Sequence, residues 1–485
     1  MFILAAVGSA AGLGNVWRFP YLAYENGGAP FFIAYLGCLF LLGFPILLTE
    51  LALGKKTEKA APEALASFSG GFFRFLGFWG IFSATVAMSY YAVVTAWAAN
   101  YLAAAPSLAW GDDPKTYFFH DFLNLSDGIF STGNLVPSIL LGLLAIYAIL
   151  YFSLFRGISS ISKFVAIFTL MPFIFLGILA INGLFLPHAF DGLKFFFLPE
   201  ISFSALFNIK IWIAAVSQVF FTLTLGLGVM IAYGALLKQK TDLIAAARAV
   251  VIGDTIVSIV AGTAIFSTLG FMAAKNGVPV SEVVASGPGL AFVVFPAAIS
   301  LVPFGAPIFA TLFFATLLTL ALTSAISLLK AIISAIEDLF PDFSHSKMVL
   351  AICLFFVTLS IPFAFQNGLF LLDIVDHFLV NYGLVAVGLF EIIAIAFFFP
   401  AEKLRDFINE TAKKPIGKWF LFSLKIFIPV VLFSLISTNF FTDISKNYGD
   451  YPTRALLFFG IFPAVAALFL ALLSAQFLGA QKSQK

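Results

Sequence analysis

The sequence has few charged residues and few residues of the kinds that hold metals or form disulfides. Asp, Glu, Lys and Arg make up 10% of its 485 residues, whereas a soluble domain usually carries about 25%. Its only two cysteines, Cys38 and Cys353, both lie in apolar runs, which does not indicate a disulfide framework or a metal site. The net charge of +2 offers no basic surface for nucleic acid. These shortages exclude an ordinary soluble domain and a nucleic-acid-binding protein.

Hydrophobic residues are abundant instead, at 61% of the chain. Apolar stretches of about 20 residues, long enough to cross a bilayer core of about 30 Å, recur along the whole length. Only helices and closed barrels satisfy the backbone in lipid, and the alternation typical of a barrel strand is not present. The sequence therefore predicts an all-α integral membrane protein of about twelve spanning helices, at 1–21, 29–53, 72–104, 137–155, 159–183, 209–238, 243–275, 307–339, 346–365, 368–399, 416–442 and 452–478.

The distribution of basic residues predicts the orientation of these helices. If the N-terminus is cytoplasmic, most basic loop residues fall on the cytoplasmic side, as the positive-inside rule requires. They are Lys55, Lys56, Lys59, Arg156, Lys238, Lys240, Lys403, Arg405, Lys413, Lys414 and Lys418. We therefore expect both termini to be cytoplasmic.

Glycines interrupt two of the predicted helices at comparable depths. The first contains Gly8, Gly12 and Gly14, and the sixth contains Gly226 and Gly228. Each glycine weakens a helix by about 1 kcal/mol, and backbone freed inside a membrane must line a cavity or bind a ligand. Close helix packing would explain one interruption equally well, but two at matching positions favour the midplane site of a transporter.

The interrupted helices lie five apart, as expected if helices one to five and six to ten form inverted repeats. This spacing predicts a first repeat over residues 1–183 and a second over residues 209–399. Two further helices follow within residues 416–478. No segment indicates a soluble domain, so we expect a single membrane domain.

Several motifs resemble those of the neurotransmitter:sodium symporter family, and the likeness covers nearly the whole chain. The run from Gly8 to Tyr21, with the following Glu25-Asn26-Gly27-Gly28, resembles the family's opening signature. The run 218–226 resembles its sixth helix, and Leu322-Thr323-Ser324 its eighth. The chain looks like the prokaryotic amino acid branch and is similar to the bacterial leucine transporter. This resemblance implies sodium-coupled amino acid symport by alternating access in the plasma membrane of a prokaryote.

The resemblance also implies two sodium ions beside the broken helices. The first would be held by the carbonyl oxygens of Ala10 and Thr222 and the side chains of Asn15, Thr222 and Asp254. The second would be held by the carbonyl oxygens of Gly8, Ala11 and Leu320 and the hydroxyls of Thr323 and Ser324. Sodium, a hard cation, favours such oxygen ligands. Taken alone, the two hydroxyls of the eighth helix would more often bond back to their own backbone.

The first break also predicts the head group of the substrate. Half-helix N-termini favour a carboxylate. In monoamine members of the resembled family an Asp replaces that carboxylate, but the matching residue here is Gly12. We therefore expect a substrate carboxylate held by the backbone N–H of Gly14 and the hydroxyl of Tyr91. The amino group is expected at the carbonyl oxygens near Ala10, Phe221 and Thr224.

The predicted wall around the substrate side chain consists of Ala87, Phe221, Thr224, Leu227, Ser327 and Leu328. The bacterial leucine transporter has Val at the position of Ala87 and Phe at the position of Leu227. Both differences enlarge the apolar end of the pocket. We predict large apolar or aromatic amino acids as substrates, with glycine and GABA disfavoured.

Asp254 lies inside the predicted seventh helix, where the resembled family usually has an asparagine. An ionisable residue inside a membrane span indicates function by default. Chloride-dependent members bind chloride with residues that match Tyr35, Gln218, Thr222, Ser258 and position 254. Asp254 would supply that negative charge, so we predict sodium-dependent and chloride-independent transport, with Asp254 also a candidate proton carrier on the return step. The alternative is a structural ion pair with a basic residue.

Further acidic and basic residues match the gates of the family. Arg18 and Asp376 match an outer gate that closes over Tyr91 and Phe221. Glu50 and Glu391 match two residues that support the break in the sixth helix. Asp338 matches the acidic member of an inner gate, and the resemblance implies a basic partner about fifteen residues before Gly8. Only seven residues precede Gly8. At 1.5 Å per residue they form about 10 Å of helix, which cannot cross half the membrane. We therefore expect the native chain to begin upstream of Met1.

Two other hypotheses fit the sequence. One is a proton-coupled carrier on the same fold, with Asp254 as the proton site and no sodium at Thr323 and Ser324. The other is a sensor that binds an amino acid without completing a transport cycle. An enzyme is not predicted, because the sequence has no catalytic triad, metal cluster or phosphate loop. The expected partners are an amino acid and the lipid bilayer, and the sequence does not indicate an oligomeric state.

Overall fold

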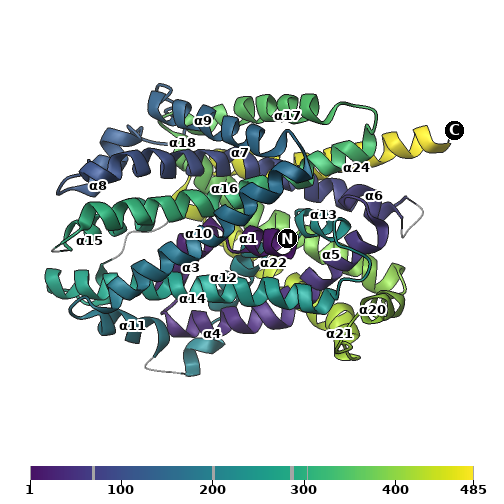
Figure 1. The fold of residues 1–485 in the computed structure, drawn as a ribbon, viewed down its shortest axis with the longest axis horizontal. Coiled ribbons are helices and arrows are strands. Elements are labelled where there is room, and N and C mark those ends of the chain that lie inside the picture. The colour runs from purple at the N-terminus through teal and green to yellow at the C-terminus, as the bar shows by residue number, and fades with distance from the viewer. Residues whose placement is uncertain (1, 68–70, 199–202, 284–288, 303, 484–485) are drawn as a thin grey trace.

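The computed structural model describes residues 2–67, 71–198, 203–283, 289–302 and 304–483, and every secondary-structure element in these ranges is a helix (Figure 1). Nine helices in these ranges are long and apolar enough to cross a membrane. They span Ala29–Thr57, Arg74–Ser107, Pro137–Leu154, Leu243–Asn276, Ala306–Leu339, His345–Ala364, Gly368–Phe398, Trp419–Asp450 and Thr453–Gly479. Each overlaps closely with a predicted helix, so the all-α prediction is confirmed.

The other three predicted spans are bent or interrupted. The fifth is α10 (Ile158–Leu184), whose end turns by 116° into α11 (Ala189–Phe197). The first is divided into α1 (Phe2–Ala10), α2 (Leu13–Val16) and α3 (Arg18–Glu25). The sixth is divided into α12 (Ile209–Thr222) and α13 (Val229–Ala235). Both interruptions lie where the glycines predict them.

Most spans are built from consecutive helical segments. They are α4 (Ala29–Cys38), η1 (Leu39–Gly43) and α5 (Phe44–Thr57); α7 (Arg74–Ala104) and η2 (Ala105–Ser107); α9 (Pro137–Leu154); α14 (Leu243–Asn276); α16 (Ala306–Leu339); α17 (His345–Ser360) and η7 (Ile361–Ala364); α18 (Gly368–Phe378), η8 (Leu379–Leu384), α19 (Val385–Ile393) and η9 (Ala394–Phe398); α21 (Trp419–Phe422), η10 (Ser423–Phe427), α22 (Ile428–Ser445) and η11 (Tyr448–Asp450); and α23 (Thr453–Ala455), η12 (Leu456–Ile461) and α24 (Phe462–Ser483).

Shorter helices lie in the connections between the spans. They are α6 (Ala61–Ala66), α8 (Pro114–Thr116), η3 (Tyr117–Phe122), η4 (Phe203–Phe207), η5 (Val280–Glu282), η6 (Leu290–Val294), α15 (Phe295–Ser300) and α20 (Ala401–Glu410).

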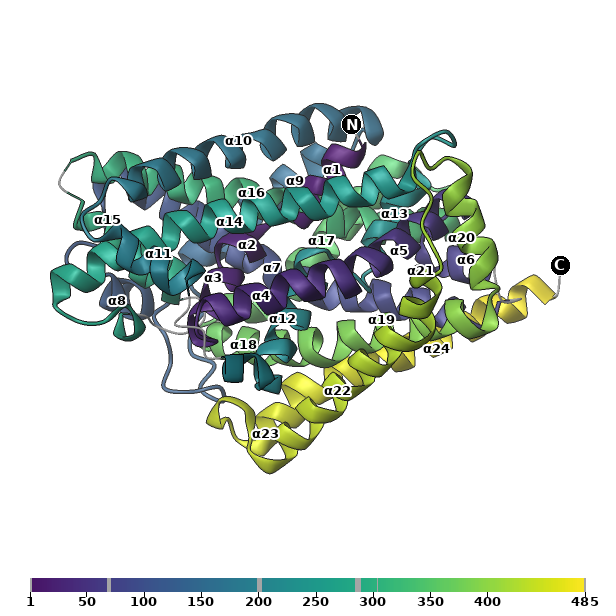
Figure 2. The same cartoon turned by 90° about the horizontal axis from the view of Figure 1, so that it is seen from below.

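The broken helices lie inside the bundle. α1 is at the centre of the view in Figure 1 and packs against α14, α10 and α16. In the apolar windows of α7 and α16, 83% of the residues are buried, against 22% in that of the last span. Figure 2 accordingly shows α22 and α24 along one edge of the bundle. The first break is therefore packed mainly by α14, α10 and α16, while α12 and α13 on either side of the second break pack mainly against α4 and α5.

Side chains satisfy the backbone at the first break. α1 ends at Ala10, and Gly12 is extended, with φ −108° and ψ −166°. The N–H of Gly12 donates to Oδ1 of Asn15 at 3.0 Å. Glycine is needed at two positions, because a Cβ would lie 2.3 Å from Ser324 Oγ at Gly12 and 2.8 Å from the Phe221 ring at Gly14.

The second break uses left-handed backbone and a buried carboxylate. Gly226 and Gly228 have φ values of +72° and +70°, and Thr224 between the two helices has φ +53°. The N–H of Gly226 donates to Oε1 of Glu50 at 2.9 Å. A carboxylate from α5 thus takes the place of the carbonyl that a continuous helix would supply.

The contact between α5 and α13 predicts the effect of a small substitution. A Cβ at Gly54 would lie 1.9 Å from the carbonyl oxygen of Ile231. Gly54→Ala is therefore expected to push the two helices apart and to lower the free energy of unfolding by about 1–3 kcal/mol, the usual cost of overpacking. Thermal unfolding in detergent measures the change. Gly177→Ala in α10, where a Cβ meets no atom within 4 Å, is the control, and equal stability of the two variants would contradict the prediction.

Candidate functional site

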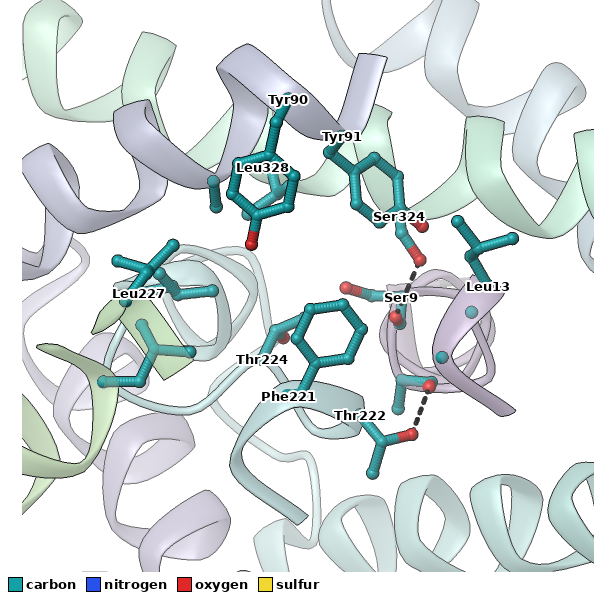
Figure 3. Close-up of a pocket in the computed structure, with 16 residues that line it drawn as sticks. Ser9, Leu13, Tyr90, Tyr91, Phe221, Thr222, Thr224, Leu227, Ser324 and Leu328 are labelled. Carbon is teal, nitrogen blue, oxygen red and sulfur yellow. Dashed lines mark hydrogen bonds between the residues drawn. The ribbon is translucent and has the colours of Figure 1, made fainter. Parts of the chain in front are cut away.

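A pocket lies between the two broken helices and is bordered by α7, α16 and η8 (Figure 3). The empty space between its lining atoms, with its open mouth included, is about 450 Å³. It is lined by Ser9, Ala10, Gly12, Leu13, Gly14, Ala87, Tyr90, Tyr91, Phe221, Thr222, Thr224, Leu227, Ser324, Leu328, Leu379 and Leu384. No charged residue is among them, so the pocket suits a ligand that is neutral overall.

The polar end of the pocket lies at the first break. The hydroxyls of Tyr91 and Ser9 are buried and make no hydrogen bond of standard geometry to the described residues. The neighbouring hydroxyl of Ser324 donates to the carbonyl oxygen of Ser9 at 3.2 Å. Unpaired buried hydroxyls are costly, so both are available to a polar group of a ligand. Tyr91 was expected here, whereas Ser9 is an addition that its place inside the glycine motif could have indicated.

The apolar end of the pocket lies on the other side. Figure 3 shows Leu227 across the pocket from Ser9 and Ser324. Leu379 and Leu384 of η8 also line the pocket, and the sequence did not predict them. The sequence could have indicated Leu379, because it follows the predicted gate residue Asp376 by about one helical turn and so lies on the same face of the helix.

One predicted wall residue does not line the pocket. The hydroxyl of Ser327 donates to the carbonyl oxygen of Thr323 at 2.8 Å and lies 2.7 Å from the hydroxyl of Tyr233. Its side chain is therefore engaged with Thr323 and Tyr233, and its expected contact with the substrate stays a prediction. The residues Ala87, Phe221, Thr224 and Leu328 all lie where they were expected, on the pocket wall.

Oxygen atoms gather beside the pocket around Thr222. Its Oγ1 lies 3.2 Å from the carbonyl oxygen of Ala10, 3.1 Å from Oδ1 of Asn15 and 2.6 Å from Oδ1 of Asp254. A hydroxyl has one hydrogen and can donate to only one of these oxygens at a time. The other two oxygens then lie close to Thr222 Oγ1 with no hydrogen between them, an arrangement that a cation would stabilise. The structure thus brings together the side chains predicted to hold the first sodium ion, and their chemistry fits that ion.

Asp254 is fully buried at the centre of a polar cluster. Its carboxylate accepts hydrogen bonds from the hydroxyls of Tyr35 and Thr222 and from the amide of Asn15, the last at 2.8 Å. The Asn15 amide also donates to Ser258 Oγ at 2.8 Å. Among the described residues no Lys, Arg or His forms an ion pair with this carboxylate. The alternative of a structural ion pair is therefore not supported in this part of the chain.

Gln218, the remaining member of the predicted anion-binding set, bridges to the first break. Its Nε2 donates to the carbonyl oxygen of Gly14 at 3.3 Å. Its Oε1 is buried and makes no hydrogen bond to the described residues. Gln218 therefore links α12 to the first break instead of to Asp254.

The residues predicted for the second sodium ion meet where α16 crosses α1. Ser324 of α16 reaches the carbonyl oxygen of Ser9, whereas the hydroxyl of Thr323 donates to Leu320 in its own helix at 2.9 Å. Gly8 and Ala11 are buried on the facing helix end. The structure therefore places this set together, with Thr323 in the back-bonded state that an isolated hydroxyl would adopt.

The outer gate residues are joined above the pocket. Arg18 Nη1 lies 2.7 Å from Asp376 Oδ2, and the hydroxyl of Tyr90 donates to the other carboxylate oxygen at 2.8 Å. Arg18 also donates to Ser217 Oγ at 2.9 Å and lies 5.1 Å from the centre of the Phe221 ring. Charged and aromatic contacts therefore join α3, α7, α12 and α18 over the ligand pocket.

The remaining predicted site residues do not line the pocket. Asp338 accepts a hydrogen bond from the N–H of Ala60 at 2.8 Å and forms no ion pair with the described residues. Met1, on which its expected partner depends, lies outside the described ranges. Glu391 is buried like Glu50, and Oε1 of Glu391 and Oε2 of Glu50 lack hydrogen-bond partners in the described part of the chain.

Comparison with known proteins decides the family. The sequence profile described as the sodium:neurotransmitter symporter family matches residues 1–113 and 107–478. The chain belongs to the sodium:neurotransmitter symporter family. This membership makes it a multi-pass membrane protein and a sodium-dependent transporter, not an enzyme, which confirms these predictions from the sequence.

Three relatives of the transporter align with it over most of its chain and over most of their own. An uncharacterized sodium-dependent transporter of Methanocaldococcus jannaschii is 38% identical over 94% of this chain and 92% of its own. The sodium- and chloride-dependent GABA transporter 2 of Rattus norvegicus is 32% identical, over 92% and 80%. The sodium-dependent dopamine transporter of Caenorhabditis elegans is 30% identical, over 97% and 84%.

If Arg18 and Asp376 form the predicted outer gate, their ion pair predicts a kinetic effect. Asp376→Asn removes the charge that holds Arg18 and is expected to speed substrate release to the outside about tenfold, because a hydrogen bond to a charged group contributes about 1.5–3 kcal/mol. Exchange of radiolabelled substrate in proteoliposomes measures this rate. Asp373→Asn is the matched control, since Asp373 bonds to Tyr448 and Tyr451 instead. Equal rates in the two variants would rule out the gate assignment.

Proposed function

We propose that the transporter couples the entry of sodium to that of an amino acid with a large apolar or aromatic side chain, without chloride. It works by alternating access in the plasma membrane of a prokaryote, with both termini in the cytoplasm. The observation that carries this proposal is the substrate pocket, which is polar at the first break, apolar at its other end and free of charged side chains among its lining residues.

The polar end favours a substrate that brings its own carboxylate. An acidic side chain at Gly12 would have to displace Ser324, whose Oγ lies 2.3 Å from the position of a Cβ. The carboxylate instead takes the Tyr91 hydroxyl and the backbone N–H groups of α2, whose N-terminus favours a negative charge. The carbonyl oxygens of Ala10, Phe221 and Thr224 accept from the ammonium group. The relative named for GABA supports the amino acid class.

The apolar end favours a large side chain. Leu227, Leu328, Leu379 and Leu384 form this wall, and Ala87 leaves room beside them. Hydrophobic stabilisation grows by about 25 cal/mol for each Å² of apolar surface removed from water. Glycine and GABA would leave these leucines without contacts, so leucine-sized and aromatic amino acids bind better.

Two sodium ions complete the proposed complex. The first lies among Ala10, Asn15, Thr222 and Asp254, where it compensates the buried carboxylate. The second lies between Gly8, Ala11 and Leu320 and the hydroxyls of Thr323 and Ser324. Both groups include backbone of the first break, so sodium binding orders the segment that also holds the substrate. That shared backbone is the physical basis of coupling.

Asp254 makes chloride unnecessary in this proposal. Its oxygens accept from Tyr35 and Thr222, two of the groups that by resemblance surround chloride in chloride-dependent members. Ser258 lies in the same cluster, 3.3 Å from the Tyr35 hydroxyl. The carboxylate of Asp254 thus gives the hydroxyls of Tyr35 and Thr222 the negative charge that a chloride ion would otherwise supply.

The same carboxylate supports a second candidate function, a proton-coupled carrier. A buried carboxylate without a basic partner is stabilised either by a cation or by a proton. In the proton-coupled scheme Asp254 alternates between these states and the hydroxyls of Thr323 and Ser324 hold no ion. The two candidates differ in their need for sodium.

Uptake into proteoliposomes tests the proposal. With an inward sodium gradient and gluconate in place of chloride, tryptophan and leucine are expected to accumulate at least about tenfold more than glycine, because a small difference in a hydrophobic pocket discriminates by factors of about 10–200. Replacing sodium by choline at constant pH should abolish uptake. Uptake that survives in choline would favour the proton-coupled carrier, and a strict chloride requirement would refute the role of Asp254.

Asp254→Asn tests the charge directly. With the carboxylate neutralised, uptake is expected to become chloride-dependent, falling about tenfold in gluconate, because charge-assisted hydrogen bonds contribute about 1.5–3 kcal/mol. The ratio of uptake in chloride to uptake in gluconate measures this effect. Asp242→Asn, at the N-cap of the same helix, is the control for lost charge and should leave the ratio at one. A ratio near one in both variants would contradict the assignment.

A further inference from the structure

A second, apolar cavity lies behind the substrate pocket. It is bordered by α7, by α18 with η8, and by η12 with α24. Its lining consists of Trp79, Ser83, Val86, Val375, Leu379, Gly383, Gly460, Pro463, Ala464 and Ala467. The empty space between these atoms, with its open side included, is about 290 Å³. No charged side chain lies among the lining residues, so this side cavity suits only apolar or weakly polar groups.

The two cavities share one residue. Leu379 lines the substrate pocket together with Leu227 and Leu384, and it also lines the side cavity together with Ser83 and Gly383. It is 5% exposed and belongs to η8, the segment that follows the gate helix α18. Leu379 is therefore the residue at which the substrate pocket and the side cavity meet.

Small residues explain why there is space beyond Leu379. Ser83, Gly383, Gly460, Ala464 and Ala467 contribute little volume where α7 and α24 meet. Gly460 also permits close approach of the helices, because a Cβ there would lie 2.1 Å from the ring of Phe378. The backbones are thus held together while the side chains leave a gap. A leucine on a helical segment can change rotamer without moving the backbone, so Leu379 can turn aside and leave the way to this gap open.

We propose that the side cavity is a second subsite for the substrate side chain, which a long apolar or aromatic side chain enters by displacing Leu379. This inference rests on the proposed amino acid function and extends it. The carboxylate of the substrate lies at the first break, and Leu227 lies across the pocket from that end (Figure 3). A side chain that fills the apolar end therefore points toward η8 and reaches Leu379 next.

The chemistry of the side cavity selects the kind of side chain. Its walls are aliphatic apart from the indole of Trp79 and the hydroxyl of Ser83. An aromatic ring gains contact with the indole, since aromatic pairs favour stacked or edge-to-face arrangements. The hydroxyl can accept one hydrogen bond, which an indole N–H donates. Tryptophan fits this description, whereas a leucine side chain ends before the partition.

The experiment compares tryptophan with leucine as substrates. For each variant, sodium-driven uptake gives kcat/KM for both amino acids, and the ratio of tryptophan to leucine is the readout. Leu379→Ala opens the partition and is expected to raise this ratio about tenfold. Ala464→Leu fills the side cavity from α24 and is expected to lower it by a similar factor. Thermal unfolding in detergent, measured for each variant, shows that the variant is folded.

Two controls separate the subsite from a general change in pocket size. Ala466→Leu places the same bulk on α24 outside the lining residues and should leave the ratio unchanged. Leu384→Ala enlarges the pocket at a leucine that does not border the side cavity. In the double variant Leu379→Ala with Ala464→Leu, the rise in the tryptophan-to-leucine ratio should be cancelled. In the double variant Leu384→Ala with Ala464→Leu, any rise in that ratio should remain, because only neighbouring sites couple. If Leu379→Ala fails to fold, Leu379→Val and Ala464→Leu alone make the same comparison.

The possible failures are distinguishable. A wild-type protein that accumulates neither amino acid with sodium overturns the proposed function, and the subsite with it. Accumulation of both, with a ratio that Ala464→Leu does not change, overturns the subsite alone. The subsite would also be overturned if leucine is taken up while tryptophan is neither taken up nor able to inhibit leucine uptake.

Discussion

A backbone group that leaves a helix inside a membrane needs a new partner, and the two breaks of this transporter release several such groups at once. Asn15 accepts from Gly12, and Glu50 accepts from Gly226. The carbonyl oxygen of Ala10 also lies 3.2 Å from Thr222 Oγ1, within the oxygen cluster beside the pocket. In the proposed complex, the substrate and the sodium ions bind at this same stretch of broken helix.

The same constraint explains how the scaffold is divided. α7, α14 and α16 are continuous helices that satisfy their own backbones. Some polar side chains at the breaks come from continuous segments, such as Glu50 of α5 and Asp254 of α14. Others, such as Asn15 and Thr222, come from the broken helices themselves. Arg18 and Asp376 lie on the elements that border the pocket mouth, where an ion pair can form and separate without disturbing the buried oxygens.

The sequence predicted the fold to the level of individual helices because apolar length and glycine position are local properties. Gly12, Gly226 and Gly228 marked both breaks, and Asp254 was identified because a carboxylate is rare in such a run. Ser327 does not line the pocket, because its hydroxyl contacts Tyr233, a residue that lies far away in sequence. Leu379 and Leu384 were missed because a leucine in an apolar helix carries no signal of its own. Which leucine faces a pocket depends on how helices rotate against each other, and that is decided by packing across the whole bundle.

In the proposed cycle, with two sodium ions and no chloride, the attached carboxylate of Asp254 changes the electrical work of transport. A chloride ion that travels with its cargo cancels one positive charge, whereas a side chain remains with the protein and returns with it. With two sodium ions and a zwitterion on board, each inward cycle then carries two net charges. A membrane potential of 100 mV contributes about 2.3 kcal/mol for each charge moved. One aspartate in place of an asparagine would thus make the accumulation of substrate depend more strongly on voltage.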